Sequence, residues 1–255
     1  MIVPELLKPF TKEFKRTLAS DEIIIESLQA VDFFIRSGGE IKYLIFEEGF
    51  NLGQIPKEIP RHGYSRQELS SFYGYRFHVG VMALAKKPRN TKLEDLGDRI
   101  LVFDGITGPE NIGSLVRLAA AFGFQSLLVD GSSCSPYTPR CIRVSTGHLF
   151  QCLVHETSNL VEALTELKEI GYEIISSELA EEAICVYDYE PSKKLAVVFG
   201  SEGRGVEKKF LELSNQIIQV PQAPGFSSLN VSHSAAIVLS ELFFKSINKA
   251  RHLKS

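Results

Sequence analysis

Small polar side chains gather between residues 220 and 240, in the sequence VPQAPGFSSLNVSHSAAIVLS. A proline-rich turn opens this stretch, and Ser228, Asn230 and Ser232 then lead directly into the apolar spacing of a helix. Polar loops of this kind carry function when a rigid scaffold positions them. Serine and asparagine in front of a helix also act as N-caps. The stretch alone therefore leaves two interpretations open, a helix cap and one wall of a binding site.

A second polar loop follows the apolar run 195–199, in the sequence LAVVFGSEGRGV. Three glycines are interleaved with Ser201, Glu202 and Arg204. Because glycine has no side chain, the backbone of such a loop can approach a ligand closely. The pattern is neither the G-x-G-x-x-G of dinucleotide sites nor a P-loop. We expect either a ligand loop of another type, in which Glu202 accepts a hydrogen bond or braces a neighbouring loop, or a plain turn.

A third candidate follows the apolar run RILVFD at residues 99–104. Asn111 stands where the N-cap of the next helix belongs, and Arg117 lies one or two turns further on, among residues expected to be buried. The planar guanidinium of Arg117 could hold a phosphate or a carboxylate through two hydrogen bonds. An arginine on a helix is also commonly solvated, so both interpretations stay open. The loop before Asn111 lies at the carboxyl end of a strand, where open α/β sheets bind ligands.

Strand-like apolar runs alternate with helical periodicity along the chain, which predicts an α/β protein of two domains. We expect a small α/β domain over residues 1–88, a polar linker over 89–96 and a larger, parallel-sheet domain over 97–255. The predicted strands are residues 22–26, 41–46, 78–85, 99–104, 126–130, 151–155, 172–176, 195–200 and 216–220. The predicted helices are residues 1–20, 28–37, 65–72, 111–122, 140–150 and 159–170, and another that follows Asn230. For helix 65–72, Ser65 and Glu68 have the spacing of a capping box.

Charge and cysteine content limit the function classes. The chain has 255 residues, a formal net charge of −3 and a pI near 6.1, which excludes a bulk polycation, so a nucleic-acid surface must be a local patch. Its four cysteines form no C-x-x-C pair, and their spacing does not suit a closed zinc site, so no metal is expected. No signal peptide or long apolar run opens the chain. We expect free thiols, a cytoplasmic location and no membrane association.

Basic and aromatic residues recur between residues 61 and 89 of the predicted first domain. They are Arg61, His62, Tyr64, Arg66, Tyr73, Tyr75, Arg76, His78, Lys86, Lys87 and Arg89. Such side chains suit phosphates and unstacked bases, yet lysine and arginine are common on any surface, and Glu47 and Glu48 lie nearby in the sequence. An RNA-facing patch and an ordinary solvated surface both stay open here.

Taken in order, the three polar stretches resemble the three motifs of the SpoU (TrmH-like) branch of the SPOUT RNA methyltransferases. The first motif is Asn111-x-Gly113-x-x-x-Arg117, the second is FGSEGRG from residue 199, and the third runs from Val220-Pro221 to SLNVS at 228–232. The resemblance covers about residue 96 to the C-terminus. The first third of the chain resembles the small substrate-binding domain that is often fused to this family.

The resemblance implies an α/β fold with a C-terminal trefoil knot, preceded by a small RNA-binding domain. It implies S-adenosyl-L-methionine as cofactor, a homodimer, and methyl transfer to a ribose 2′-hydroxyl of tRNA or rRNA. Carried onto this chain, the cofactor is held largely by backbone around Gly200, Val220 and Leu229. The catalytic set implied in the same way is Asn111, Arg117, Glu202, Ser228 and Asn230. Of these, Glu202 and Asn230 support the loops, Ser228 lies near the incoming ribose, and Arg117 faces a phosphate or the reacting hydroxyl.

The sequence departs from the family in its third motif, which commonly reads Ile-Pro-Met with a glycine two residues further on. Here residues 220–225 read VPQAPG, which brings Gln222 into the motif and places Gly225 one position late, and His233 stands where a small or aliphatic residue is usual. Two alternatives remain: a non-catalytic RNA-binding or assembly factor on the same scaffold, which the intact motif residues disfavour, and a Rossmann-type dehydrogenase, which lacks its glycine pattern here.

Overall fold

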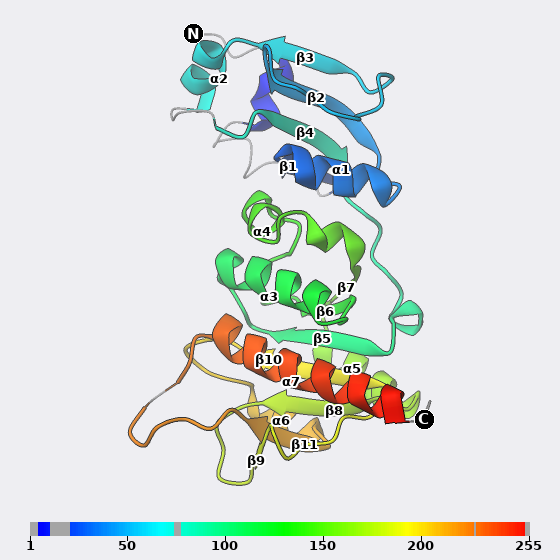
Figure 1. Ribbon diagram of the computed structural model, residues 1–255, viewed down its shortest axis with the longest axis vertical. Coiled ribbons are helices and arrows are strands. Elements are labelled where there is room, and N and C mark those ends of the chain that lie inside the picture. The colour runs from blue at the N-terminus through cyan, green and yellow to red at the C-terminus, as the bar shows by residue number, and fades with distance from the viewer. Residues whose placement is uncertain (1–4, 11–20, 74–77, 227, 253–255) are drawn as a thin grey trace. The chain divides into compact units, whose positions relative to one another are not determined.

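The computed structural model of this chain describes residues 5–10, 21–73, 78–226 and 228–252 (Figure 1). The chain forms two compact units. The first consists of Met1–Arg89 together with Tyr137–Gln151, and the second of Asn90–Pro136 together with Cys152–Ser255. Residues Tyr137–Gln151, which come from the second half of the chain, therefore belong to the first unit.

The first unit is built on a mixed four-stranded sheet with the strand order β1-β4-β2-β3. Strand β4 pairs antiparallel with both β1 and β2, and β3 pairs parallel with β2. The strands are β1 (Glu22–Glu26), β2 (Ile41–Glu47), β3 (Arg61–Tyr64) and β4 (Val81–Lys86). The helices are α1 (Leu28–Arg36), α2 (Arg66–Tyr73), α4 (Pro139–Val144), and the 3-10 turns η1 (Glu5–Phe10) and η4 (His148–Gln151). One apolar cluster of this unit joins Leu7 and Phe10 to Ile24, Ile45 and Leu84 of the sheet.

Local sequence signals explain several of these boundaries. The predicted capping box of α2 is confirmed: the N–H of Ser65 donates to Oε2 of Glu68 at 2.8 Å, and the N–H of Glu68 donates to Oγ of Ser65 at 3.3 Å. The predicted helix 140–150 is wrong in its second half, because Thr146 and Gly147 both take positive φ and end α4. Of the predicted helix 1–20, the structure describes the η1 turn, and residues 11–20 lie outside the described part.

The second unit contains a seven-stranded sheet in which every pairing is parallel, with the order β7-β6-β5-β10-β8-β11-β9. The strands are β5 (Arg99–Asp104), β6 (Ser126–Asp130), β7 (Leu153–Thr157), β8 (Glu173–Ser177), β9 (Ile184–Cys185), β10 (Leu195–Gly200) and β11 (Gln216–Gln219). Strand β10 comes late in the chain but lies between β5 and β8. The predicted α/β class with a parallel C-terminal sheet is confirmed.

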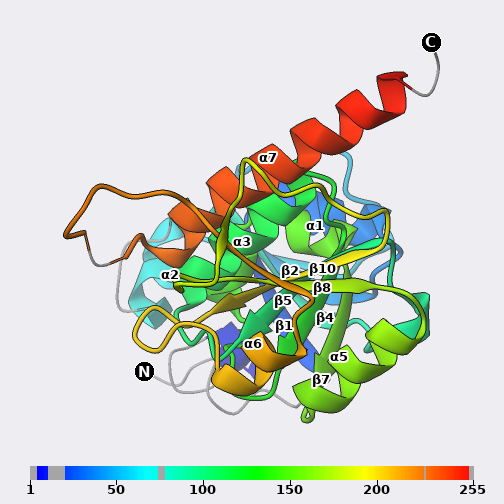
Figure 2. The same cartoon turned by 90° about the horizontal axis from the view of Figure 1, so that it is seen from below.

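Helices cover both faces of the parallel sheet, which explains why its strands are nearly continuous apolar runs. They are α3 (Pro109–Ala121), α5 (Leu160–Glu169), α6 (Lys208–Leu213) and α7 (Val231–His252), and a 3-10 turn, η3 (Leu93–Asp95), precedes β5. Figure 2 shows α3 and α7 side by side on one face, with α5 and α6 opposite. On the α5/α6 face, Leu164 and Phe210 pack with Ile100, Ile174 and Val198.

The sequence did not predict the short elements β3, β9 and α6, which hold two to six residues each. Elements of this length carry too few apolar positions for a period to be visible. In the part of the chain that the structure describes, no helix combines the length and apolar character needed to cross a membrane.

Candidate active site

Helix α3 carries two of the predicted site residues, Asn111 and Arg117. Its N-cap is Gly108, and Pro109 occupies the first helical position, where the fixed φ of proline suits a helix start. The predicted N-cap role of Asn111 is therefore wrong. Asn111 lies inside the first turn instead, and its side-chain amide is used for a contact with another segment.

The glycine loop after β10 folds tightly back on itself. Ser201 and Gly205 form an antiparallel bridge, and the N–H of Gly205 donates to the carbonyl of Ser201 at 2.8 Å. A Cβ placed on Gly200 would lie 2.1 Å from the backbone of Gly205. Position 200 therefore requires glycine, because two backbone segments approach each other there.

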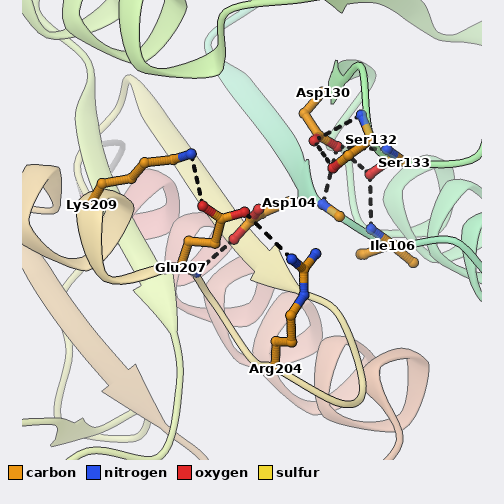
Figure 3. Close-up of polar contacts among 9 residues, drawn as sticks. Asp104, Ile106, Asp130, Ser132, Ser133, Arg204, Glu207 and Lys209 are labelled. Carbon is orange, nitrogen blue, oxygen red and sulfur yellow. Dashed lines mark hydrogen bonds and ion pairs between the residues drawn. The ribbon is translucent and has the colours of Figure 1, made fainter.

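Carboxylates from both strands that flank β10 hold the far end of this loop. The N–H of Val206 donates to Oε2 of Glu178, just past β8, at 2.7 Å. The N–H of Glu207 donates to Oδ2 of Asp104, the last residue of β5, at 2.7 Å (Figure 3). The loop that carries Glu202 is thus fixed to the neighbouring strand on each side.

The side chain of Glu207 adds a surface network beside Asp104 (Figure 3). Nζ of Lys209 lies 2.7 Å from Oε2 of Glu207, and Nη1 of Arg204 lies 3.9 Å from Oε1. The guanidinium of Arg204 also lies over Gly105, where a Cβ would come within 2.5 Å of Nη2. The side chain of Arg204 therefore lies on the surface of the second unit, between Glu207 and the end of β5.

Asp130, at the end of β6, organises the loop in front of α3 in the same way (Figure 3). Its carboxylate accepts from the backbone N–H of Gly105 at 3.1 Å and of Ser133 at 3.0 Å, and from the hydroxyls of Ser132 and Ser133. Oγ of Ser133 in turn accepts from the N–H of Ile106 at 2.9 Å. The two aspartates thus support the loops that lead to Glu202 and to Asn111.

The surroundings of the two aspartates shift their pKa values in opposite directions. Burial raises the pKa of Asp104 above the ordinary 3.8, and the hydrogen bond from Glu207 only partly offsets this. Burial acts on Asp130 too, but its hydrogen bonds from Ser132, Ser133 and Gly105 outweigh burial and lower its pKa. Oδ1 of Asp104 is buried and has no hydrogen-bond partner among the described residues, which agrees with the raised pKa.

Replacing each aspartate by asparagine is expected to change stability with opposite pH dependence. The raised pKa of Asp104 means that its contribution is full below pH 3.8 and is lost as the pH rises through the folded value. The lowered pKa of Asp130 means that its contribution is present above pH 3.8 and is lost as the pH falls. Urea unfolding between about pH 3 and pH 7 checks this. Relative to the wild type, Asp104→Asn should gain stability as the pH rises and Asp130→Asn should lose it; parallel curves would contradict the assignment.

Asn230 starts the last helix and also contacts the other two motifs. Its Oδ1 accepts from the N–H of Ser232 at 2.9 Å, so the predicted cap at the start of α7 is confirmed. Its Nδ2 donates to Oδ1 of Asn111 at 3.2 Å and to Oε1 of Glu202. Nδ2 of Asn111 donates to the same Oε1 of Glu202 at 2.8 Å. The three polar stretches of the sequence therefore meet in one hydrogen-bonded cluster, Asn111–Glu202–Asn230.

A cavity opens beside this cluster, between the loops that follow β8, β10 and β11. Its walls include the three predicted cofactor residues Gly200, Val220 and Leu229, together with Glu202 and Ser228. Residues that the sequence analysis did not assign to a site also line it: Ser177, Glu178, Leu179, Phe199, Ser201, Gly205, Gln219, Gln222, Val231 and Ser234. Most of these follow strand ends, so the rule that ligands bind at the carboxyl ends of parallel strands could have indicated them.

Arg117 lies apart from the cavity lining, although it is on the same helix as Asn111. It is exposed, whereas its neighbours Leu115 and Val116 are buried as expected. Within the described residues, no hydrogen bond or ion pair holds its guanidinium. His233, on the first turn of α7, is exposed as well. The structure thus leaves Arg117 available to a group from outside this domain.

The three motifs, the parallel sheet and the cavity are those expected of one family, and residues 98–240 match the model of the SpoU rRNA Methylase family. The chain belongs to the SpoU family. The predicted resemblance is confirmed, and with it the classification among RNA 2′-O methyltransferases.

Similar proteins agree with this membership. The 23S rRNA (guanosine-2′-O-)-methyltransferase of Vibrio vulnificus is 30% identical over 172 residues, which cover 64% of this SpoU chain and 69% of that protein. A solved RNA 2′-O ribose methyltransferase is 26% identical, with a TM-score of 0.75 and coverage of 92% of both chains. The SpoU methyltransferase AviRb of Streptomyces viridochromogenes, solved with AdoMet, has a TM-score of 0.77 at 20% identity and covers 93% of this chain and 94% of its own. That last likeness shows the shared fold.

Proposed function

We propose that this SpoU-family chain transfers a methyl group from S-adenosyl-L-methionine to a ribose 2′-hydroxyl of tRNA or rRNA. The observation that carries the proposal is the convergence of Asn111, Glu202 and Asn230 beside a cavity at the strand ends. Family membership and the ribose and guanosine-2′-O activities named for its relatives support the same reaction.

The cavity residues fit a bound S-adenosylmethionine. Gly200 lines the cavity and carries no side chain, so its backbone groups can approach a ligand there. Ser201, Glu202 and Ser228 add polar side chains to the same wall, which suits a polar ligand. We assign Gly200, Val220 and Leu229 to cofactor binding, largely through their backbone groups.

When bound, the cofactor supplies an electrophilic methyl group on a sulfonium. The protein must hold an oxygen nucleophile in line with that methyl, so positioning supplies much of the rate. We assign Ser228, which is exposed at the cavity rim, to contact with the incoming ribose. We assign Glu202 and Asn230 to the support of the loops that form the site. Asn111 is assigned the same supporting role, since it is hydrogen-bonded to both.

Arg117 is assigned to a substrate phosphate and to stabilisation of charge at the reacting oxygen. Its side chain is exposed and unpaired within the described chain, so it can engage a phosphate with its planar fork. A guanidinium stays protonated in proteins and is therefore a poor general base. The proton of the 2′-hydroxyl therefore passes to a base other than Arg117.

The first unit is proposed to bind the RNA substrate, and the active form is proposed to be a homodimer. The mixed sheet carries Arg61, His62 and Tyr64 on β3, where basic and aromatic groups suit phosphates and bases. The C-terminal trefoil knot and the cytoplasmic location stay predictions. Sedimentation of the intact chain at micromolar concentration tests the dimer.

Calorimetric titration with S-adenosylmethionine separates the proposal from the main alternative, a non-catalytic RNA-binding factor on this scaffold. A catalytic protein is expected to bind the cofactor at one site per chain. Folded protein without measurable heat or thermal shift at millimolar cofactor would favour the alternative. Titration with a nicotinamide cofactor is the control, and binding of that cofactor would support the dehydrogenase alternative instead.

A further inference from the structure

The loop between β11 and α7 exposes the ring of Phe226, whose exposed fraction is 57%. Of the large apolar side chains that the structure describes, none is more exposed. Figures 1 and 2 show the chain after β11 projecting outward from the parallel sheet of the second unit. A single exposed apolar side chain is common on protein surfaces, so exposure alone does not identify a binding residue.

A β-turn holds Phe226 in place. The N–H of Phe226 donates to the carbonyl of Ala223 at 3.2 Å, and Gly225 has a φ of +83°. Pro224 comes directly before this glycine. Proline followed by glycine with a positive φ is typical of a type II turn, in which each residue suits the backbone angle that its position requires. The turn is therefore preorganised, so little backbone entropy is lost when a ligand binds to the ring.

Phe226 lies beside the candidate active-site cavity without lining it. Gln222 and Ser228, which precede and follow it in the sequence, both belong to the cavity wall. Ser228 is two positions away, so the Cα atoms of Phe226 and Ser228 lie within about 7 Å of each other. Because the ring is not part of the wall, a cofactor in the cavity is not expected to cover it. The substrate that approaches Ser228 is the group placed to do so.

The chemical character of the loop favours a nucleobase as the group that covers the ring. Residues 220–230 contain no charged side chain, so this loop offers no cation to a phosphate. An aromatic ring stacks on the face of an unpaired base, whichever base it is. A second copy of the chain is a weaker candidate, because one ring is a small part of the area that a stable protein interface buries.

We propose that Phe226 stacks on an unpaired base of the substrate RNA, at or next to the nucleotide that is methylated. The inference rests on the proposed function, which supplies RNA as the substrate and places its ribose near Ser228. Stacking fixes the base, and the attached ribose is thereby held in line with the methyl donor. The substrate contacts are then divided between Arg117 for a phosphate, Ser228 for the ribose and Phe226 for a base.

Fluorescence tests the contact directly, because the chain contains no tryptophan and Phe226→Trp introduces a single indole. Total RNA that lacks its own 2′-O methylation should quench the emission of this variant, since indole stacks on bases as phenyl does. Inorganic polyphosphate, which has the charge but no bases, should not. Phe244→Trp is the matched control, because Phe244 is 56% exposed, lies on α7 and does not line the cavity. Equal quenching of both variants by RNA, or quenching of Phe226→Trp by polyphosphate, would overturn the proposal.

Kinetics test whether the contact serves the reaction. Phe226→Ala should lower kcat/KM for RNA at least about fivefold, as expected for one lost base stack. Phe226→Leu, which is apolar but has no flat ring, should lose nearly as much, whereas Phe226→Trp should keep close to the wild-type value. The measurement is the initial rate of labelled methyl transfer at limiting RNA. The melting temperature of Phe226→Ala and its affinity for S-adenosylhomocysteine should match those of the wild type, because the ring is exposed and lies outside the cavity wall.

The contrary outcomes separate this inference from the function on which it rests. A wild-type kcat/KM in Phe226→Ala would overturn the stacking role. Full activity in Phe226→Leu, or a lower sedimentation coefficient for Phe226→Ala, would overturn it as well, because the ring would then serve a general apolar contact or a contact between two copies of the chain. A wild-type protein that transfers no methyl group to RNA would instead overturn the proposed function, so the two failures are distinguishable.

Discussion

Replacing Arg117 by lysine is expected to lower the rate of methyl transfer about 100-fold, the loss typical when a group that stabilises a developing charge is removed. The substitution keeps the positive charge but removes the planar fork that can hold a phosphate through two hydrogen bonds. Cofactor affinity should stay within about twofold of the wild type, because Arg117 does not line the cavity. The measurement is single-turnover transfer of labelled methyl to RNA, with the cofactor affinity determined separately.

Arg36→Lys is the matched control for Arg117→Lys. Arg36 is also an exposed arginine on a helix, but its guanidinium is paired with Asp32 at 2.9 Å. That variant should transfer methyl groups at close to the wild-type rate. Near-normal turnover by Arg117→Lys would contradict the proposal that Arg117 binds a substrate phosphate.

Replacing Glu202 by alanine is expected to lower the transfer rate about 10- to 100-fold, because small misplacements of catalytic loops are costly. Oε1 of Glu202 is the shared acceptor for Asn111 and Asn230, so its loss leaves two amides without that partner. The expected loss of stability is about 1–2 kcal/mol, in the usual range for an unsatisfied donor that is partly solvated. Kinetics and urea unfolding measure the two effects.

Glu212→Ala is the control for a lost surface carboxylate, since among the described residues Glu212 makes just an exposed i,i+4 pair with Lys208. It should change stability by less than about 0.5 kcal/mol. If the cluster acts as a unit, the effect of Asn111→Ala in the Glu202→Ala background should be much smaller than in the wild type. Fully additive effects would contradict a cluster that positions the site jointly.

The sequence predicted the regular part of the fold because its strands and helices have strong apolar periods. β1, β5 and β6 have the predicted bounds, since buried parallel strands and short apolar strands end abruptly at polar or glycine residues. The helix start was predicted at Asn111, because asparagine is a common N-cap. The helix begins two residues earlier, because Pro109 is a stronger start signal than Asn111.

The candidate site was predictable in part. The three motifs identified Glu202 and Asn230, but the contact between them depends on how the loops after β10 and β11 fold, which no local pattern encodes. The supporting roles of Asp104 and Glu178 arise from strand order, because β10 inserts between β5 and β8. Sequence periodicity does not contain that order. The burial of one oxygen of Gln222 likewise depends on tertiary packing.

The central claim is methyl transfer to a ribose 2′-hydroxyl, and mapping of the product tests it most directly. The intact protein is incubated with labelled S-adenosylmethionine and total RNA that lacks its own 2′-O methylation, and the RNA is then hydrolysed with alkali. A 2′-O-methyl group blocks cleavage at its nucleotide, so the account predicts that the label is found in alkali-resistant dinucleotides from one position. Label carried by a base in mononucleotides would contradict the account.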